Sequence, residues 1–212
     1  MTRAHSLCLI RLDMPEVLAI ENEAFEFRWS EDDFHRQLQQ RNTIGMVAES
    51  RVGLGAGKHA EQGDVVVGFM VYDLEIRSLR VTDFAVAHAW RRKGVGRQMV
   101  DKLKAKLTAT KRSRIELVVR ERNVAAQLFW RANGFQAVEI VRDYYDDTAE
   151  DGYRFEWFAG LDADKHVEPL AGLGAGKHVE PNAGDKKTSP KPIFHNRLAG
   201  RFKEDANDVG FE

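Results

Sequence analysis

Apolar residues recur every four positions in the stretch that begins at Val95. Val95, Met99, Leu103 and Leu107 place four apolar side chains along one face of a helix, which we expect to end near Lys111. A helix with one apolar face is stabilised by burying that face against another element. The pattern therefore predicts a helix that packs on a sheet.

Two shorter helices are predicted nearer the N-terminus by residues that suit helix starts. Asp13 precedes Glu16 at the spacing of a capping box, and Pro15 fits the first turn. Ser30 is a second N-cap candidate, before a stretch whose apolar positions include Phe34. We expect a helix after each of these caps.

Apolar runs between turn residues predict strands. The expected strands are Ser6–Arg11, Ile44–Glu49, Val65–Leu74, Ser78–Val86, Arg114–Val119, Gln136–Tyr144 and Gly152–Phe158. Asn123 is a favourable N-cap for a further helix, and Gly134 suits the position just past its end. The order strand, two helices, three strands, helix, strand, helix and two strands predicts an α+β or mixed α/β domain.

The composition changes after residue 158. Residues 159–212 are rich in Gly, Pro, Lys, Asp and Asn and poor in aromatic residues. Such a segment buries too little apolar surface to offset the entropy of ordering it. We expect a folded domain over 1–158 and a flexible, low-complexity tail over 159–212.

A short sequence recurs in both parts of the chain. ADKHVEPLAG begins at Ala163 and AGKHVEPNAG at Ala175, and a related copy begins at Ala56 within a glycine-rich insertion near 52–64. The stretch GLGAGKH lacks the glycine spacing and the hydroxyl residue of a phosphate-binding P-loop. The histidines of the repeats lack paired ligand spacing, so we interpret the repeats as spacers and expect no metal site.

The near balance of charge argues against a general attraction to nucleic acid or membrane. The chain has 32 Lys and Arg against 33 Asp and Glu, a net charge of −1. Its single cysteine, Cys8, allows no disulfide framework and fits a reducing compartment. No apolar run approaches the ~18 residues of a membrane span, and no signal-peptide core is present at the N-terminus. We expect a cytoplasmic protein with no membrane partner and no direct nucleic-acid partner.

Positive charge is nevertheless concentrated on one turn, AWRRKGVGRQMV, between Ala89 and Val100. Its cations are Arg91, Arg92, Lys93 and Arg97, and its glycines are Gly94 and Gly96. A helix start offers unpaired backbone N–H groups and the positive end of the helix dipole. Glycine lets that backbone approach a ligand, and Arg and Lys add charge-assisted hydrogen bonds. The turn therefore predicts a pyrophosphate cradle.

The pattern R-x-x-G-x-G at Arg91–Gly96, after a strand and before a helix, resembles the acetyl-CoA signature of the GNAT N-acetyltransferases. The resemblance covers about residues 6–158. The stretches FAV, RRKGVGR, VR-x2-N-x-AA, NGF and RDYY most resemble the RimI-like group, which acetylates the N-terminal alanine of a ribosomal protein. The resemblance implies an α+β GNAT fold, with a mostly antiparallel twisted sheet of about seven strands, four helices, and strands four and five splayed to hold acetyl-CoA.

The resemblance also implies which residues hold acetyl-CoA as cosubstrate. They are Phe84, Ala85, Val86, Arg91, Arg92, Lys93, Gly94, Val95, Gly96, Arg97 and Asn123. The strand backbone at Phe84–Val86 would pair with the pantetheine amides, and an N–H near Val86 would polarise the thioester carbonyl. Asn123 would contact the thiol end besides capping its helix. The implied acceptor is the N-terminal α-amino group of a protein, with a ribosomal protein as the example.

The acid and base residues of the RimI-like group are replaced in this chain. The base position holds Val118 and the acid position holds Trp130, and neither side chain transfers a proton. Glu116 precedes Val118 by two residues, so it faces the same side of the strand about 6.6 Å away. Glu116 is our candidate catalytic base, with an ion pair to Arg114 or Arg120 as the structural alternative.

Three interpretations of the reaction stay open. A neighbouring residue takes over proton transfer, for which Tyr144, Tyr145, Glu121 and Glu21 are further candidates. Alternatively, positioning of the amine alone supports the reaction, or the protein binds CoA with little or no transfer. Small amines are alternative acceptors, and the acid-rich stretch Arg142–Asp151 would attract a cationic amine. A non-enzymatic module that docks RNA phosphates is the alternative of a different class.

Overall fold

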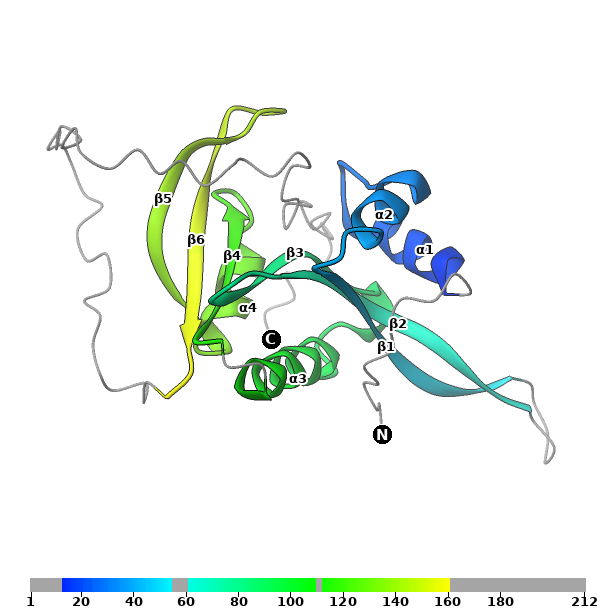
Figure 1. Ribbon diagram of the computed structural model, residues 1–212. Helices are drawn as coiled ribbons and strands as arrows, with labels where there is room; N and C mark the ends of the chain where they lie inside the picture. Colours follow the sequence, from blue (N-terminus) through cyan, green and yellow to red (C-terminus); the bar gives the residue numbers. More distant parts are fainter. Residues whose placement is uncertain (1–12, 55–60, 110–111, 161–212) are drawn as a thin grey trace, which may run out of the picture.

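A computed structural model describes residues 13–54, 61–109 and 112–160 (Figure 1). The helices are α1 (Met14–Ala24), α2 (Glu31–Leu38), α3 (Val95–Ala109) and α4 (Val124–Ala132), with a short 3₁₀ helix, η1 (His88–Trp90). The strands are β1 (Thr43–Leu54), β2 (Glu61–Leu74), β3 (Ser78–Val86), β4 (Arg114–Arg120), β5 (Gln136–Tyr145) and β6 (Glu150–Phe158). The predicted strand Ser6–Arg11 and the predicted tail beyond residue 160 lie outside the described residues.

The described strands form one mixed sheet. Its order is β1-β2-β3-β4-β6-β5, and within it β3 and β4 run parallel whereas the other neighbours run antiparallel. The parallel pair is joined through α3, which is the crossover that parallel strands require. The predicted α+β fold is therefore confirmed, with six strands and four α-helices in the described part of the chain.

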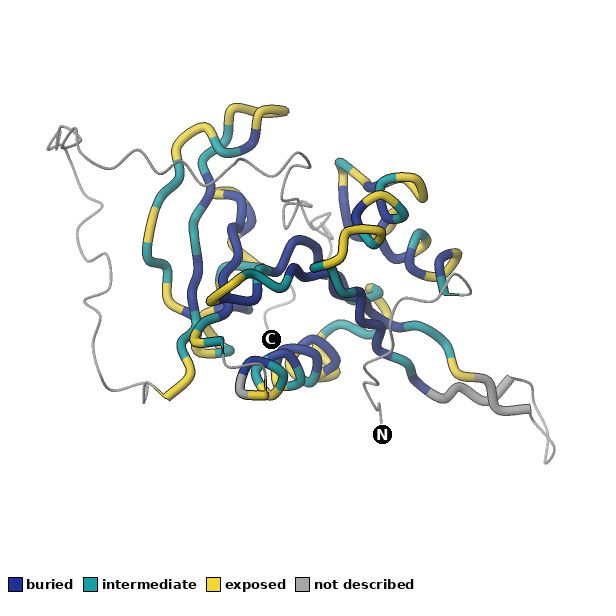
Figure 2. The backbone as a smooth tube through the Cα atoms, in the orientation of Figure 1, coloured by how far each residue is buried: buried dark blue, intermediate teal, exposed yellow. Residues whose placement is uncertain are grey.

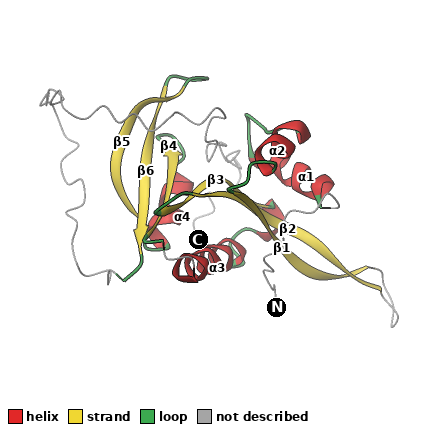
Figure 3. Ribbon diagram, viewed as in Figure 1, coloured by secondary structure: helices red, strands yellow, loops and turns green. Residues whose placement is uncertain are grey.

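Helices cover the two faces of the sheet in separate layers. Figures 1 and 3 show α1 and α2 on one side of β1, β2 and β3, and α3 on the other. The α3 side holds the larger core, in which the predicted face of Val95, Met99, Leu103 and Leu107 is at most 1% exposed. Each such side chain contributes about 1.5–3 kcal/mol by its burial. Figure 2 shows that burial is deepest in the central strands and along α3, while β5 and the β5–β6 turn stay largely at the surface.

Of the two caps predicted nearer the N-terminus, one forms and the other does not. Ser30 has an extended backbone, and its side chain accepts from the Asp33 N–H while Asp33 accepts from the Ser30 N–H. The capping box predicted for Asp13 and Glu16 is wrong, because Asp13 makes no side-chain cap hydrogen bond. Asp13 has helical backbone angles, φ −91° and ψ −4°, whereas a capping side chain reaches the first turn from an extended residue.

The hairpin of β1 and β2 is longer than the predicted strands. Pairing continues past Ser50 to Leu54, which lies opposite Glu61. These residues belong to the glycine-rich insertion that we expected to be a loop. The amino-acid composition did not predict the extension of the strands. A β ladder is built from backbone N–H and C=O groups, and glycine carries these as well. The connection itself, residues 55–60, lies outside the described residues.

Candidate active site

The parallel strands β3 and β4 separate after a short paired stretch. Their register joins Ser78 with Arg114, Leu79 with Ile115 and Arg80 with Glu116. Beyond these pairs, β3 continues along β2 to the pair of Val86 with Gly68, and β4 continues along β6 to the pair of Arg120 with Gly152. The predicted splay of these two strands is thereby confirmed, and its open end lies at the carboxyl ends of both strands.

The basic turn follows the open end of β3. After η1, residues 91–94 form a tight turn, and α3 begins at Val95. Gly94 has φ +81°, a conformation that strains residues with a side chain, and a Cβ there would meet only open space and the Gln98 amide at 4.0 Å. Arg92 adopts φ 58° as well. The turn therefore presents the backbone of Gly94, just before the helix, to solvent.

A second glycine lets the helix approach its neighbours. A Cβ on Gly96 would lie 3.1 Å from the Phe129 ring and 3.2 Å from the Phe84 ring. Those two rings stack at 5.4 Å between β3 and α4. Gly96 is thus needed for close packing of α3. Because it lies in the first turn, its backbone N–H is one of those that have no partner within the helix.

The exposed cations of the turn are not neutralised by acids in the first turn of α3, which has none. Arg92 and Lys93 are exposed, and the Lys93 ammonium lies 5.0 Å from the centre of the Trp90 ring. Arg97 is exposed and lies 4.0 Å from Asp101 one turn later. Arg91 differs, because its Nε donates to the Val86 carbonyl at 3.1 Å and so ties the turn to the end of β3. This donor set fits a diphosphate.

The side chains of the predicted pantetheine strand are used in packing. Ala85 is buried in the α1 core, whereas Phe84 and Val86 pack against the α3 core. Val95, at the start of α3, is 1% exposed. The side chains at these four positions are therefore engaged in packing.

Asn123 follows the open end of β4. It is 7% exposed, and its Oδ1 accepts from the Ala126 N–H at 3.0 Å, which confirms its predicted role as the N-cap of α4. The parting strands therefore end in two helix starts, one basic and one capped by an amide.

The residues at the two replaced positions belong to packed clusters. Val118 contacts Tyr144 and Tyr145, and a Cβ on Gly152 would approach Val118 Cγ1 to 2.4 Å. Trp130 is fully buried and lies 5.4 Å from Phe84, ring centre to ring centre. These environments are those of core side chains, in agreement with the absence of proton-transfer chemistry at both positions.

Glu116 lies at the closed end of the splay. It is 8% exposed, and its carboxylate accepts from Arg80 Nε at 3.2 Å and Ser78 Oγ at 3.1 Å, with Arg114 Nε at 3.3 Å. Of the two ion-pair partners considered from sequence, Arg114 is present and Arg120 is not, and the carboxylate is buried rather than exposed. Its assignment as the base stays a prediction, and its surroundings favour the structural alternative.

The other candidates for proton transfer are unevenly placed. Tyr145 is fully buried and donates to the Val118 carbonyl at 3.3 Å, and burial raises its pKa well above the usual value. Glu21 is also fully buried and accepts from the Trp29 N–H at 2.7 Å. Tyr144 is half-buried and Glu121 is exposed. The structure does not gather these residues around one reacting atom.

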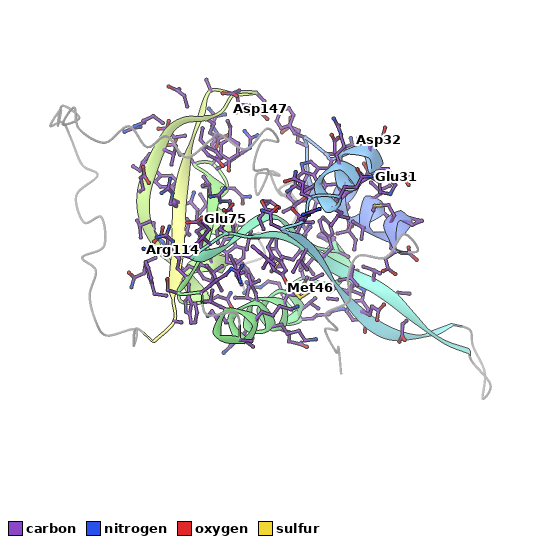
Figure 4. All side chains as sticks on the ribbon, in the orientation of Figure 1. Glu31, Asp32, Met46, Glu75, Arg114 and Asp147 are labelled. Carbon is purple, nitrogen blue, oxygen red and sulfur yellow. The ribbon has the colours of Figure 1, made fainter. Side chains whose placement is uncertain are left out.

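A hollow lies beside the end of β4, between the α1–α2 segment and the β5–β6 turn. Its lining consists of Glu26, Phe27, Arg120, Arg122, Asn123, Thr148 and Glu150. Figure 4 shows Asp147 on this turn, at the opposite end of the strands from Arg114. The sequence analysis identified Asn123, and it included Thr148 and Glu150 in the acid-rich stretch Arg142–Asp151. It considered Arg120 only as an ion-pair partner of Glu116, and it did not identify Glu26, Phe27 or Arg122. The available sign for Arg120 was a cation at the end of the apolar run LVV.

Two other kinds of site were sought in the described ranges. There, no group of three or more His, Cys, Asp or Glu residues could hold a metal ion. None of the helices described is long and apolar enough to cross a membrane.

Comparison with known proteins gives consistent matches. The model of the acetyltransferase (GNAT) family matches residues 14–135. The [ribosomal protein bS18]-alanine N-acetyltransferase of Escherichia coli strain K12 is 26% identical over 136 residues, which cover 64% of this chain and 83% of the relative. Its counterpart in Salmonella typhimurium is 25% identical over 134 residues, 63% of this chain and 81% of the relative.

Solved structures share the fold. The ribosomal-protein-S18-alanine N-acetyltransferase from Escherichia coli superposes with a TM-score of 0.60 at 23% identity, covering 78% of this chain and 99% of that one. Arabidopsis thaliana NAA60 in complex with acetyl-CoA gives a TM-score of 0.60 at 13% identity, covering 74% and 99%.

Proposed function

The chain belongs to the acetyltransferase (GNAT) family, and on that premise we propose that it transfers an acetyl group from acetyl-CoA to the N-terminal α-amino group of a protein. The observation that carries the proposal is the parting of β3 from β4 beyond Arg80 and Glu116, with the basic turn at the open end. A gap between parallel strands leaves backbone groups without sheet partners, which a bound amide chain would satisfy.

The proposed contacts to acetyl-CoA follow the geometry of the turn. The backbone N–H groups of Gly94–Gly96 and the exposed side chains of Arg92, Lys93 and Arg97 would hold the diphosphate. Arg91 would support the turn through its bond to Val86. The backbone of Phe84–Val86 would contact the pantetheine amides.

The reaction joins an amine nitrogen to the thioester carbonyl carbon. The C–N bond forms, the C–S bond breaks, the nitrogen loses a proton, and the departing thiolate takes one up. Bound acetyl-CoA supplies the activated acyl group. The N–H near Val86 would polarise its carbonyl. Because Val118 and Trp130 occupy the usual base and acid positions, we propose that positioning of the amine supplies most of the acceleration, with proton transfer through water.

The nature of the acceptor is supported by the site and by the relatives. The similar enzymes are named for a ribosomal protein alanine as their substrate. In this chain the hollow beside Asn123 is lined by the carboxylates of Glu26 and Glu150. Asp147 adds charge nearby: burial acts to raise its pKa, but the hydrogen bond and charge of Arg120 outweigh it, so the pKa lies below the usual value. Because Arg120 forms ion pairs with Asp147 and Glu150, we assign the attraction of a cationic amino terminus chiefly to Glu26.

A CoA-binding protein without transfer activity is the second candidate. The observation that favours it is the packing of Val118 and Trp130 into core clusters, where neither handles protons. Binding and transfer must therefore be measured separately.

The test combines two assays on the full chain. Calorimetry measures acetyl-CoA binding, and mass spectrometry follows acetyl transfer to an alanine-starting peptide, to the same peptide with a blocked N-terminus, and to spermidine. We expect binding, and transfer only to the free peptide N-terminus. Transfer to spermidine alone would make the acceptor a small amine, and binding without transfer would establish the second candidate.

A paired variant locates the binding site. Replacing Arg92 and Lys93 together by Ala should weaken acetyl-CoA binding by at least about tenfold, since a hydrogen bond to a charged group contributes about 1.5–3 kcal/mol. Arg131→Ala removes an exposed cation on α4 and should leave binding unchanged. Equal affinities for all three proteins, or stabilisation by RNA in place of acetyl-CoA, would contradict the assignment of the turn.

A further inference from the structure

Arg120, the last residue of β4, connects three segments that are distant in the sequence. It lies between the turn that joins β5 to β6 and the segment between α1 and α2. With 5% of its surface exposed, it is buried more deeply than is usual for arginine. A guanidinium in such a place needs partners that offset the loss of hydration.

The first set of partners lies on the β5–β6 turn. Nη2 of Arg120 is 2.5 Å from Asp147 Oδ2, and Nη1 donates to Thr148 Oγ1 at 2.7 Å and to Glu150 Oε2 at 3.3 Å. The second oxygen of Glu150 accepts from the Arg122 N–H at 2.7 Å. Three residues of this turn region, Asp147, Thr148 and Glu150, are thus bound to the end of β4.

The second set of partners is aromatic. The guanidinium carbon lies 4.0 Å from the centre of the Tyr145 ring and 5.3 Å from the centre of the Phe27 ring. Phe27 belongs to the segment between α1 and α2. A planar guanidinium can stack on rings while its edge donates to carboxylates, which a lysine ammonium cannot do. Arg120 therefore links the two walls of the hollow lined by Phe27 and Thr148.

We propose that Arg120 is a positioning residue of the acceptor site, which fixes the turn Asp146–Ala149 opposite Phe27 and so sets the width of the hollow that receives the acceptor amino terminus. This inference rests on the proposed function. Arg120 acts through the two walls. Because it forms ion pairs with Asp147 and Glu150, Glu26 is the carboxylate of the lining that has no guanidinium at hydrogen-bond distance among the described residues.

The test compares Arg120→Lys and Arg120→Gln with wild type. Arg120→Gln should raise the KM for an alanine-starting peptide by about tenfold or more, with kcat and the Kd for acetyl-CoA changed by less than about threefold. Arg120→Lys keeps the charge but loses the planar guanidinium that stacks on the two rings. We therefore expect a KM between those of wild type and Arg120→Gln. Arg36→Gln is the matched control, because Arg36 forms an ion pair of the same 2.5 Å length with Asp33 on exposed α2; its KM should equal that of wild type.

Hydrogen exchange of residues 146–150 provides a readout independent of activity. Faster exchange in Arg120→Gln than in Arg36→Gln is expected, since the turn loses its anchor. If Arg120→Gln fails to fold, Asp147→Asn, which cuts the same contact from the surface side, replaces it with the same expectations. An unchanged KM in a folded variant overturns the proposal. If wild type itself transfers no acetyl group, the proposed function fails, and the exchange measurement still decides whether Arg120 holds the turn.

Discussion

The carboxylate of Glu116 on β4 accepts a hydrogen bond from Nε of Arg80 on β3 at 3.2 Å, across the last register pair that joins these two strands. Ser78 and Arg114 bind the same carboxylate. The point at which the strands begin to part is therefore tied by a partly buried ion pair. The splay above it is a fixed feature of the fold, because the closed end cannot slide without breaking these bonds.

Glu116→Gln should lower stability more than it lowers the rate. Loss of the charge leaves Arg80 and Arg114 without their shared partner, which we expect to cost on the order of 1–2 kcal/mol given their partial exposure. The value of kcat should stay within about threefold of wild type. Urea unfolding and saturating kinetics measure the two effects. A hundredfold fall in kcat at unchanged stability would instead identify Glu116 as the base.

Val118→Glu should increase the transfer rate. The new carboxylate would stand on the strand face that leads from Glu116 to Arg120, beside Tyr144. It would supply a proton acceptor at the position that the resemblance assigns to the base. We expect kcat to rise by roughly tenfold to a hundredfold, with a new ionisation in the profile of kcat against pH. Val118→Gln has nearly the same shape but accepts no proton, so an equal gain in that variant would contradict the explanation.

Gly152→Ala should destabilise the sheet. The added Cβ would lie 2.4 Å from Val118 Cγ1 and 3.1 Å from Tyr144 Cβ, so β4 or β5 must shift. Overpacking of this kind costs about 1–3 kcal/mol. Chemical denaturation measures the loss. In a Val118→Ala background the clash is relieved, and the same substitution should cost much less; equal costs in the two backgrounds would refute a direct Val118–Gly152 contact.

Glu156→Gln should stabilise the protein near neutral pH and not in acid. Burial raises the pKa of Glu156 above its usual 4.5; the charge of Arg114 acts to lower the pKa, and the charge of nearby Glu116 acts to raise it. A carboxyl with a raised folded-state pKa favours folding at pH values below the unfolded-state pKa, and that contribution is lost as the pH rises through the folded-state pKa. Glutamine does not ionise, so Glu156→Gln avoids the loss of stability that deprotonation of Glu156 causes.

The gain for Glu156→Gln should therefore be up to about 1 kcal/mol at pH 7 and should vanish at about pH 4. Urea denaturation at both pH values measures it. Glu139→Gln, in an exposed ion pair with Arg154, should show no such trend. A gain that is independent of pH would argue against the raised pKa as its cause.

Local chemistry explains why the element order and the basic turn could be predicted from the sequence. The period of Val95, Met99 and Leu103, the cap at Ser30 and the glycines after Lys93 each act within a few residues of their own position. The assignment of Val118 and Trp130 to the base and acid positions came from the resemblance to the RimI-like group and stays a prediction. The same local reasoning failed at Asp13, where the backbone conformation, not the residue type, decides whether a cap forms.

Only the tertiary structure decided what the charged residues of β4 contact. Glu116 meets Arg80, 36 positions earlier, and Arg120 meets Asp147, 27 positions later. Strand register and the path of two turns determine which of these distant residues meet. The residue type of a side chain does not indicate which distant partner the fold brings into contact with it. The sequence by itself thus determined where the basic turn stands, because its residues are neighbours along the chain. The packing of the strands determined which carboxylates pair with arginine and which line the hollow.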